Sequence, residues 1–146
     1  MSTTKKIKLS VLTLFLIIGS VNLRAQEKYT GLNLLINLGN TSSFSVNYEF
    51  DVYEQVTVAP FLLIDFDGNF GLGARGRYYF DALFKLDNPW DVYAGLDLGW
   101  RFTRNDFQAG FFIGGRWHIN EVISVELEFE GGTVFSGASA GIGLKF

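Results

Sequence analysis

Apolar and polar side chains alternate with a period of two from about residue 29 to the last residue, Phe146, and no stretch there has apolar residues at helical spacing. Residues 44–52 show the pattern unbroken, because every second residue from Phe44 to Val52 is apolar and the residues between them are polar. Successive side chains of a β-strand point to opposite faces, so this alternation predicts two-faced strands. Eight strands are predicted, at residues 29–39, 44–52, 56–66, 70–80, 90–102, 107–119, 123–130 and 133–146.

The connections between the predicted strands are short, with one exception at residues 81–89, and several contain Gly, Asn, Asp or Ser in a turn-forming pattern. Short connections join strands that are neighbours in the sequence and run antiparallel. The chain is therefore predicted to be all-β, with an up-and-down order of strands.

The two faces of these strands differ in side-chain size as well as in polarity. The polar face combines many glycines with charged residues, whereas the apolar face carries Leu and large aromatic residues. The inner face of a small closed barrel is the cramped one, so we place glycine and charge inside. The opposite orientation, with Leu96, Leu98 and Phe111 inside, would describe a secreted carrier.

An apolar outer surface of this size exceeds what a soluble monomer tolerates, but it suits contact with lipid. The run at residues 90–102 would cover roughly 25 to 30 Å along the axis of a tilted barrel, which matches the apolar band of an outer membrane. The sequence thus predicts an eight-stranded antiparallel up-and-down transmembrane β-barrel. Aromatic residues at the strand ends predict two girdles at the headgroup layers. One girdle contains Tyr78, Phe80, Trp90 and Trp117, and the other contains Phe66, Phe70, Trp100, Phe102 and Phe107.

The inward-facing charges predict a filled lumen. An eight-stranded barrel is only wide enough for its own side chains, so these charges should pair across strands. A ring of charges that selects ions would need a wider bore. We expect Arg75 and Arg77 to pair with Asp65 and Asp97, and Arg116 to pair with Glu126 or Glu128. The predicted lumen network comprises Arg75, Arg77, Arg101, Arg116, Asp65, Asp97, Glu126 and Glu128.

The first 25 residues have a different composition. Lys5, Lys6 and Lys8 precede a mainly apolar run at residues 9–18, and the small residue Ala25 follows it. This order of regions predicts a secretory signal peptide, because the apolar run is shorter than the roughly 20 residues of a membrane-spanning helix. We therefore predict a signal peptide at residues 1–25 and a barrel domain at residues 26–146.

Removal of residues 1–25 would leave 15 acidic and 8 basic residues. An exported acidic chain lacks the basic surface that binds nucleic acid, so no nucleic-acid partner is expected. The chain has no Cys, which excludes disulfides and thiolate metal sites.

The last eight residues, SAGIGLKF, resemble the C-terminal insertion signal of Gram-negative outer-membrane barrels. In that signal a polar residue is followed two positions later by Gly, and apolar residues then alternate up to a terminal Phe. The corresponding residues here are Ser139, Gly141, Leu144 and Phe146. Residues 26–146 resemble the small eight-stranded class of OmpX and the OmpA membrane domain. The stretches GARGRYYF and DVYAGLDLGW resemble bacterial outer-membrane β-barrel or porin-family proteins of similar size. The resemblance implies insertion into outer-membrane lipid by the barrel-assembly machinery, with both termini in the periplasm.

Three motifs that could indicate chemistry have simpler interpretations. GLGARG at residues 71–76 matches a dinucleotide fingerprint but lies within a predicted strand, where no helix N-terminus is available. DFDGN at residues 65–69 resembles the start of a calcium loop, yet Gly76 stands where a bidentate Glu belongs. His118, Ser124 and Glu126 could in principle form a hydrolytic triad, but His118 is predicted to face the lumen rather than the lipid.

The function predicted from sequence is that of a non-enzymatic, monomeric outer-membrane barrel with a structural or surface role. No catalytic residue, cofactor or metal is expected. The connections on the predicted outer side are short, which argues against adhesion through long loops. A narrow pore or transporter for small solutes is the main alternative, and an envelope lipid hydrolase is a weaker one.

Overall fold

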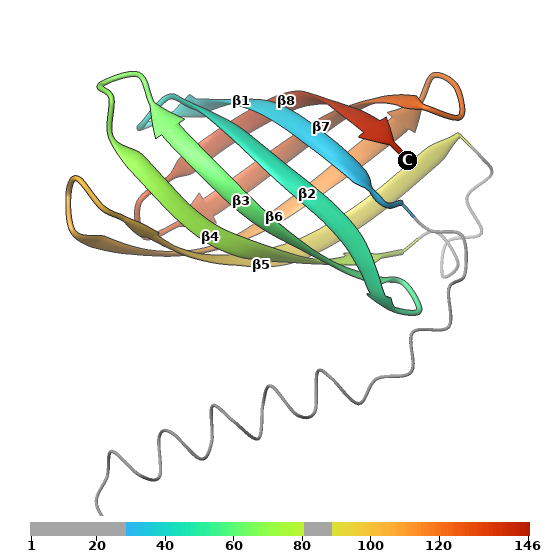
Figure 1. Ribbon diagram of the computed structural model, residues 1–146, viewed down its shortest axis with the longest axis horizontal. Helices are drawn as coiled ribbons and strands as arrows, with labels where there is room; N and C mark the ends of the chain where they lie inside the picture. The colour runs from blue at the N-terminus through green and yellow to red at the C-terminus, as the bar shows by residue number, and fades with distance from the viewer. Residues whose placement is uncertain (1–28, 81–88) are drawn as a thin grey trace, which may run out of the picture.

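A computed structural model describes residues 29–80 and 89–146. The predicted signal peptide and most of the 81–89 connection lie outside these residues. The described part of the chain forms a closed barrel of eight antiparallel strands in sequence order, which confirms the predicted fold (Figure 1). The strands are β1 (Gly31–Gly39), β2 (Ser43–Tyr53), β3 (Val56–Asp65), β4 (Phe70–Tyr79), β5 (Trp90–Arg101), β6 (Asp106–His118), β7 (Ile123–Gly132) and β8 (Ser136–Lys145).

The barrel is closed by β1 and β8. These strands pair antiparallel from Gly31 opposite Lys145 to Gly39 opposite Gly137. Closure gives both strands a backbone partner on each side, so the barrel has no open edge at this seam. Among the described residues, no helix has the length and apolar character needed to cross a bilayer.

The barrel has two distinct ends. We call the end that holds Tyr29 and Phe146 the terminal end; the connections β2–β3 and β6–β7 also lie there. The opposite end, called the far end, holds the short connections β1–β2, β3–β4, β5–β6 and β7–β8. At the terminal end the backbone N–H of Phe146 donates to the carbonyl of Thr30 at 2.9 Å.

The last strand is shorter than predicted. It begins at Ser136 rather than at residue 133, because residues 133–135 form the far-end connection, and Phe135 is only 5% exposed. Asn40 of the adjacent connection stabilises this arrangement: its Nδ2 donates to the carbonyl of Val134 at 3.0 Å, and its Oδ1 accepts from the N–H of Ser136 at 2.8 Å. The first strand likewise begins at Gly31, two residues later than predicted.

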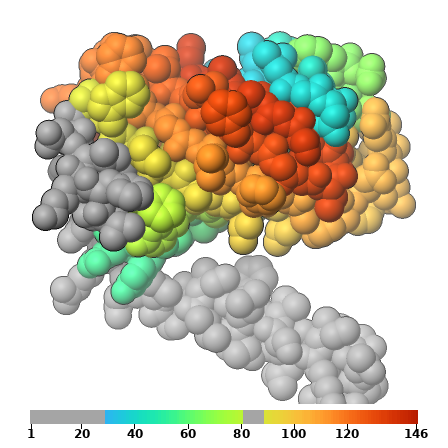
Figure 2. Space-filling model, turned by 180° about the vertical axis from the view of Figure 1, so that it is seen from behind, coloured from blue at the N-terminus to red at the C-terminus, as the bar shows by residue number. Residues whose placement is uncertain are grey.

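The orientation of the side chains excludes the secreted-carrier alternative. Leu96 and Phe111 are 66% and 63% exposed on the outer surface, whereas Arg75 and Asp97 are buried in the lumen. Figure 2 shows this outer surface over β7 and β8, in orange to red. Exposed aromatic rings contact one another near both ends. The stacked pair of Trp90 and Trp117 marks the terminal end, and the stacked pair of Phe70 and Phe102 marks the far end.

Candidate functional site

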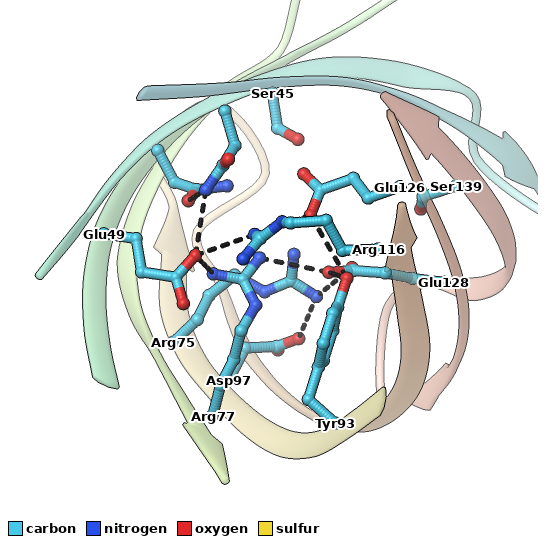
Figure 3. A network of polar contacts seen from close by, with 12 residues as sticks. Ser45, Glu49, Arg75, Arg77, Tyr93, Asp97, Arg116, Glu126, Glu128 and Ser139 are labelled. Carbon is cyan, nitrogen blue, oxygen red and sulfur yellow. Dashed lines mark hydrogen bonds and ion pairs between the residues drawn. The ribbon is translucent and has the colours of Figure 1, made fainter. Parts of the chain in front are cut away.

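The middle of the lumen is built around the carboxylate of Glu49 on β2. Its Oε2 accepts hydrogen bonds from Arg77 on β4 and Arg116 on β6, both at 2.9 Å (Figure 3). Its Oε1 accepts from the hydroxyls of Thr57, at 2.6 Å, and Tyr79. Hydrogen bonds to a charged acceptor are among the strongest in proteins, so Glu49 of β2 holds side chains from β3, β4 and β6 at one point.

The same arginines also reach the opposite wall. Arg77 donates to Oε1 of Glu128 at 3.0 Å, and Arg116 donates to Oε2 of Glu126 at 2.9 Å. The side chains of both arginines and of Glu49 and Glu128 have no solvent exposure. Contacts between β2, β4, β6 and β7 therefore cross the whole bore and fill it. We call these five residues, Glu49, Arg77, Arg116, Glu126 and Glu128, the central layer.

Glycines on the inner wall make room for large aromatic rings. A Cβ added at Gly114 would lie 2.7 Å from the ring of Tyr93, and one added at Gly95 would lie 2.5 Å from the ring of Phe112. Each ring thus occupies the space above a glycine on an adjacent strand. Tyr93 in turn donates to Glu128 at 3.0 Å, so the glycines allow a ring to support the central layer.

Tyr29 covers the central layer at the terminal end. Its ring centroid lies 3.7 Å from the guanidinium carbon of Arg116, and its hydroxyl donates to Oδ1 of Asn33 at 2.7 Å. The residue is 4% exposed, and burial raises the pKa of its hydroxyl to about 12, although the charge of Arg116 opposes this change. Tyr29 was not among the residues predicted to fill the lumen. Its alternation with Gly31 and Asn33 was the available signal that it faces the lumen.

Arg75 lies on the far side of the central layer. Its Nη2 is 2.8 Å from Glu128, 3.5 Å from Glu130 and 4.0 Å from Asp97. The approach to Glu128 is close, but its angle does not suit a hydrogen bond, so the contact is an ion pair. The guanidinium carbon also lies 3.9 Å from the centre of the Phe112 ring. Beyond Arg75 a cavity of about 20 Å³ is bounded partly by Phe135.

The expected ion pairs are formed only in part. Arg116 contacts Glu126, and Arg75 approaches Asp97, but Asp65 pairs with Arg101 at 3.3 Å rather than with Arg75 or Arg77. The reason is position along the barrel, because Asp65 and Arg101 are the last residues of β3 and β5 at the far end. Glu49 and Glu130 were missing from the predicted network. Both lie on the polar face of their strands, which was the available signal.

The calcium-like motif at residues 65–69 is a turn. Oδ1 of Asp65 accepts from the backbone N–H groups of Asp67 and Asn69, and Oδ2 accepts from the side-chain amide of Asn69 at 2.7 Å. The carboxylate is thus used to hold the β3–β4 connection. Among the described residues no group of three or more His, Asp or Glu side chains could hold a metal ion. The GLGARG motif lies in β4, between two antiparallel neighbours.

The residues considered for hydrolysis have other partners. Nε2 of His118 lies 2.6 Å from Oδ2 of Asp91, and the hydroxyl of Ser124 lies 3.5 Å from the carbonyl of Gly143. His118 and Ser124 are opposite each other in the β6–β7 register, yet no hydrogen bond joins their side chains in the part of the chain that the structure describes. Glu126 belongs to the central layer. The structure therefore does not assemble a His, Ser and carboxylate relay here.

The residues that resemble an insertion signal divide between the two faces of β8. Ser139 is buried in the lumen, where its hydroxyl donates to Asn37 at 2.7 Å. A Cβ added at Gly141 would overlap the backbone carbonyl oxygen of Leu34, so this position favours glycine. Leu144 pairs with Leu32 of β1 and Ile123 of β7, and Phe146 is 76% exposed. These four residues thus combine two close-packed inner positions with two positions outside the lumen.

The fold is similar to solved transmembrane barrels at low sequence identity. A barrel from the de novo design of transmembrane β-barrels is 13% identical, with a TM-score of 0.67 over 84% of this chain and 100% of that chain. The crystal structure of Neisserial surface protein A (NspA) is 12% identical, with a TM-score of 0.52 over 80% of this chain and 94% of that chain. No protein-family model and no curated protein matches the sequence. The chain therefore has the fold of a small eight-stranded transmembrane β-barrel.

Proposed function

We propose that this chain is a non-enzymatic integral protein of a Gram-negative outer membrane, with a structural or surface role and a lumen that does not conduct. The observation that carries the proposal is the central layer, in which hydrogen bonds to Glu49 and Glu128 cross the bore through side chains with no solvent exposure. A solute would have to break several charge-assisted hydrogen bonds to pass. The outer surface supports the membrane location, because an apolar belt of this extent suits lipid.

The remaining parts of the proposal follow from this topology. An even number of strands places both termini at one end, and we assign that end to the periplasm. The far end would then face outward with short connections. Outer-membrane lipid is the partner of the mature barrel, and the barrel-assembly machinery would recognise Ser139, Gly141, Leu144 and Phe146 during insertion. The chain acts as a monomer in this proposal.

Membrane fractionation combined with gel mobility before and after heating tests the location and the folded state. We expect the protein in the outer-membrane fraction, with a mobility that changes on heating because the closed barrel unfolds. A soluble protein with no change in mobility would contradict the proposal.

Conductance across planar bilayers tests the closed lumen. The wild-type protein should give no steady current, whereas Arg77→Ala combined with Arg116→Ala should open a path through the central layer. Heat-dependent mobility shows whether the double variant has folded. Steady current through the wild type would instead support a narrow pore.

Lipid analysis of the envelope tests the hydrolase alternative. We expect His118→Ala to leave the lipid composition unchanged, whereas a change in lipid composition would support a hydrolase.

A further inference from the structure

The charges in the lumen do not balance. The guanidinium groups of three arginines, Arg75, Arg77 and Arg116, contact five carboxyl groups within 4.0 Å. Buried carboxylates are stable only when they are paired and hydrogen bonded. Two negative charges would be left over if every carboxyl group were ionised. The five carboxyl groups are those of Glu49, Asp97, Glu126, Glu128 and Glu130.

The surplus lies at one place, next to Arg75. Within the central layer, Arg77 and Arg116 contact Glu49, Glu126 and Glu128 at 2.9 to 3.0 Å. Arg75 is the only described arginine that contacts Asp97 and Glu130, and it lies closer to Glu128 than to either of them. Of the five carboxyl groups, Asp97 and Glu130 are therefore the two whose negative charge is least compensated by arginine.

These two carboxyl groups face each other across Gly110 of β6. A Cβ added at Gly110 would lie 3.1 Å from Oδ1 of Asp97 and 3.1 Å from Oε1 of Glu130. Glycine therefore permits the approach of two acids from β5 and β7. Both side chains are deeply buried, with 2% exposure for Asp97 and 6% for Glu130. Oε1 of Glu130 is buried and has no hydrogen-bond partner among residues 29–80 and 89–146.

The other walls around this pair carry no further compensating charge among the described residues. Both acids line the cavity of about 20 Å³, which has room for about one water molecule. From β6, Gln108 donates to Oδ1 of Asp97 at 3.4 Å. β1 and β2 contribute the neutral polar side chains of Asn37 and Ser45, and the remaining lining is Phe61, Leu63 and Phe135. Arg75 from β4 and Glu128 from β7 are the other charged groups nearby.

We propose that Asp97 and Glu130 form a proton-binding pair that holds one proton at neutral pH. A proton on one carboxyl group lets its O–H donate to the other, which gives Oε1 of Glu130 a partner and removes one surplus charge. Two carboxyl groups that share a site do not both ionise readily. A metal ion could also neutralise the surplus negative charge. However, the guanidinium group of Arg75 already lies 3.5 Å from Glu130, and the described residues offer no three-ligand cluster. The pair lies in the lumen, so it does not depend on which membrane holds the barrel.

Infrared difference spectroscopy of the full barrel folded in detergent micelles tests this pair. At pH 7 the wild type should show the C=O band of a protonated carboxyl group, and the band should shift in D₂O. Glu130→Gln and Asp97→Asn should each abolish the band, because the remaining acid is left with Arg75 and ionises. Glu121→Gln, at an exposed position of the β6–β7 connection, should leave it unchanged. Heat-dependent gel mobility verifies that each variant is folded.

Two results would overturn the proposal. One is a wild type without the band at pH 7, and the other is a band that persists in both Glu130→Gln and Asp97→Asn. Thermal unfolding measured with NaCl, with CaCl₂ and with a chelator distinguishes a bound metal ion from a bound proton. If the band is absent and stability depends on one of these cations, the pair binds that cation instead of a proton. Stability that is independent of both cations, together with the band, supports the proton.

Discussion

The ring of Tyr29 lies over the guanidinium group of Arg116, 3.7 Å from its central carbon. This contact links the first described residue of the chain to the central layer. Arg116 also donates to Glu49 and Glu126, so one guanidinium group contacts both an aromatic ring and two carboxylates. A residue that precedes the first strand thus packs on the terminal-end side of the central layer.

Replacing Tyr29 with Ala should destabilise the barrel and expose Arg116 to water. A cation–π contact of a desolvated arginine contributes up to about 2 kcal/mol, and burial of the ring adds to this. We therefore expect the free energy of unfolding to fall by about 2 to 3 kcal/mol in Tyr29→Ala. Urea unfolding in lipid vesicles, followed by tryptophan fluorescence, measures the change.

The matched control is Tyr29→Phe, which keeps the ring over Arg116 and removes only the hydrogen bond to Asn33. Its loss should be about 1 kcal/mol, the net value of a typical hydrogen bond. Equal losses in the two variants would show that the hydroxyl, and not the ring, stabilises this end.

Glu49→Gln should be among the most damaging single substitutions in the lumen. It removes the negative charge that Arg77 and Arg116 share, and breaking a buried ion pair from one side typically costs about 3 to 5 kcal/mol. The same unfolding measurement applies. Glu54→Gln, at the exposed β2–β3 connection five residues away, should change stability by less than about 0.5 kcal/mol. A loss in Glu49→Gln no larger than that of the control would mean that the central layer adds little to stability.

The architecture could be predicted from the sequence because a period of two determines the strand face directly. Leu96 and Asp97 are adjacent in the chain, yet one is 66% exposed and the other 2% exposed, as their alternation predicts. The errors in strand length arise at connections. Phe135 fits the aromatic composition of a strand, but it turns into the lumen because hydrogen bonds to Asn40 fix the neighbouring residues.

The partners within the lumen were harder to predict. Lumen side chains cross the bore, so Arg77 of β4 reaches both Glu49 of β2 and Glu128 of β7. Sequence alternation tells which residues face inward, but it does not give the register that places them at one height. Asp65 is an example. It faces the lumen as predicted, but its position along the barrel axis places it next to Arg101.

An arginine at the middle of the outer surface should destabilise the barrel in a bilayer. Leu96 lies midway along β5 and is 66% exposed, so Leu96→Arg would place a charge in the hydrocarbon layer. The expected cost is about 2 to 4 kcal/mol, measured by unfolding in vesicles. Ile119→Arg, at the start of the β6–β7 connection, should cost only about 0 to 1 kcal/mol because it lies near the headgroups. Equal costs at the two positions would contradict a membrane-spanning orientation.

Phe146→Ala should separate assembly from stability. The backbone N–H of Phe146 still donates to Thr30 after the substitution, and the ring it removes is 76% exposed, so the folded barrel loses few contacts. We expect unfolding in vesicles to change by less than about 1 kcal/mol, since exposed substitutions have small effects. If the barrel-assembly machinery recognises the last residues, the amount of folded protein in the outer membrane of cells should nevertheless fall.

Leu127→Ala, at an exposed apolar position in the middle of β7, controls for the loss of an apolar side chain. It should leave the amount of folded protein in the membrane unchanged. Equal amounts of folded Phe146→Ala and wild-type protein in the membrane would contradict a role for the terminal aromatic residue in assembly.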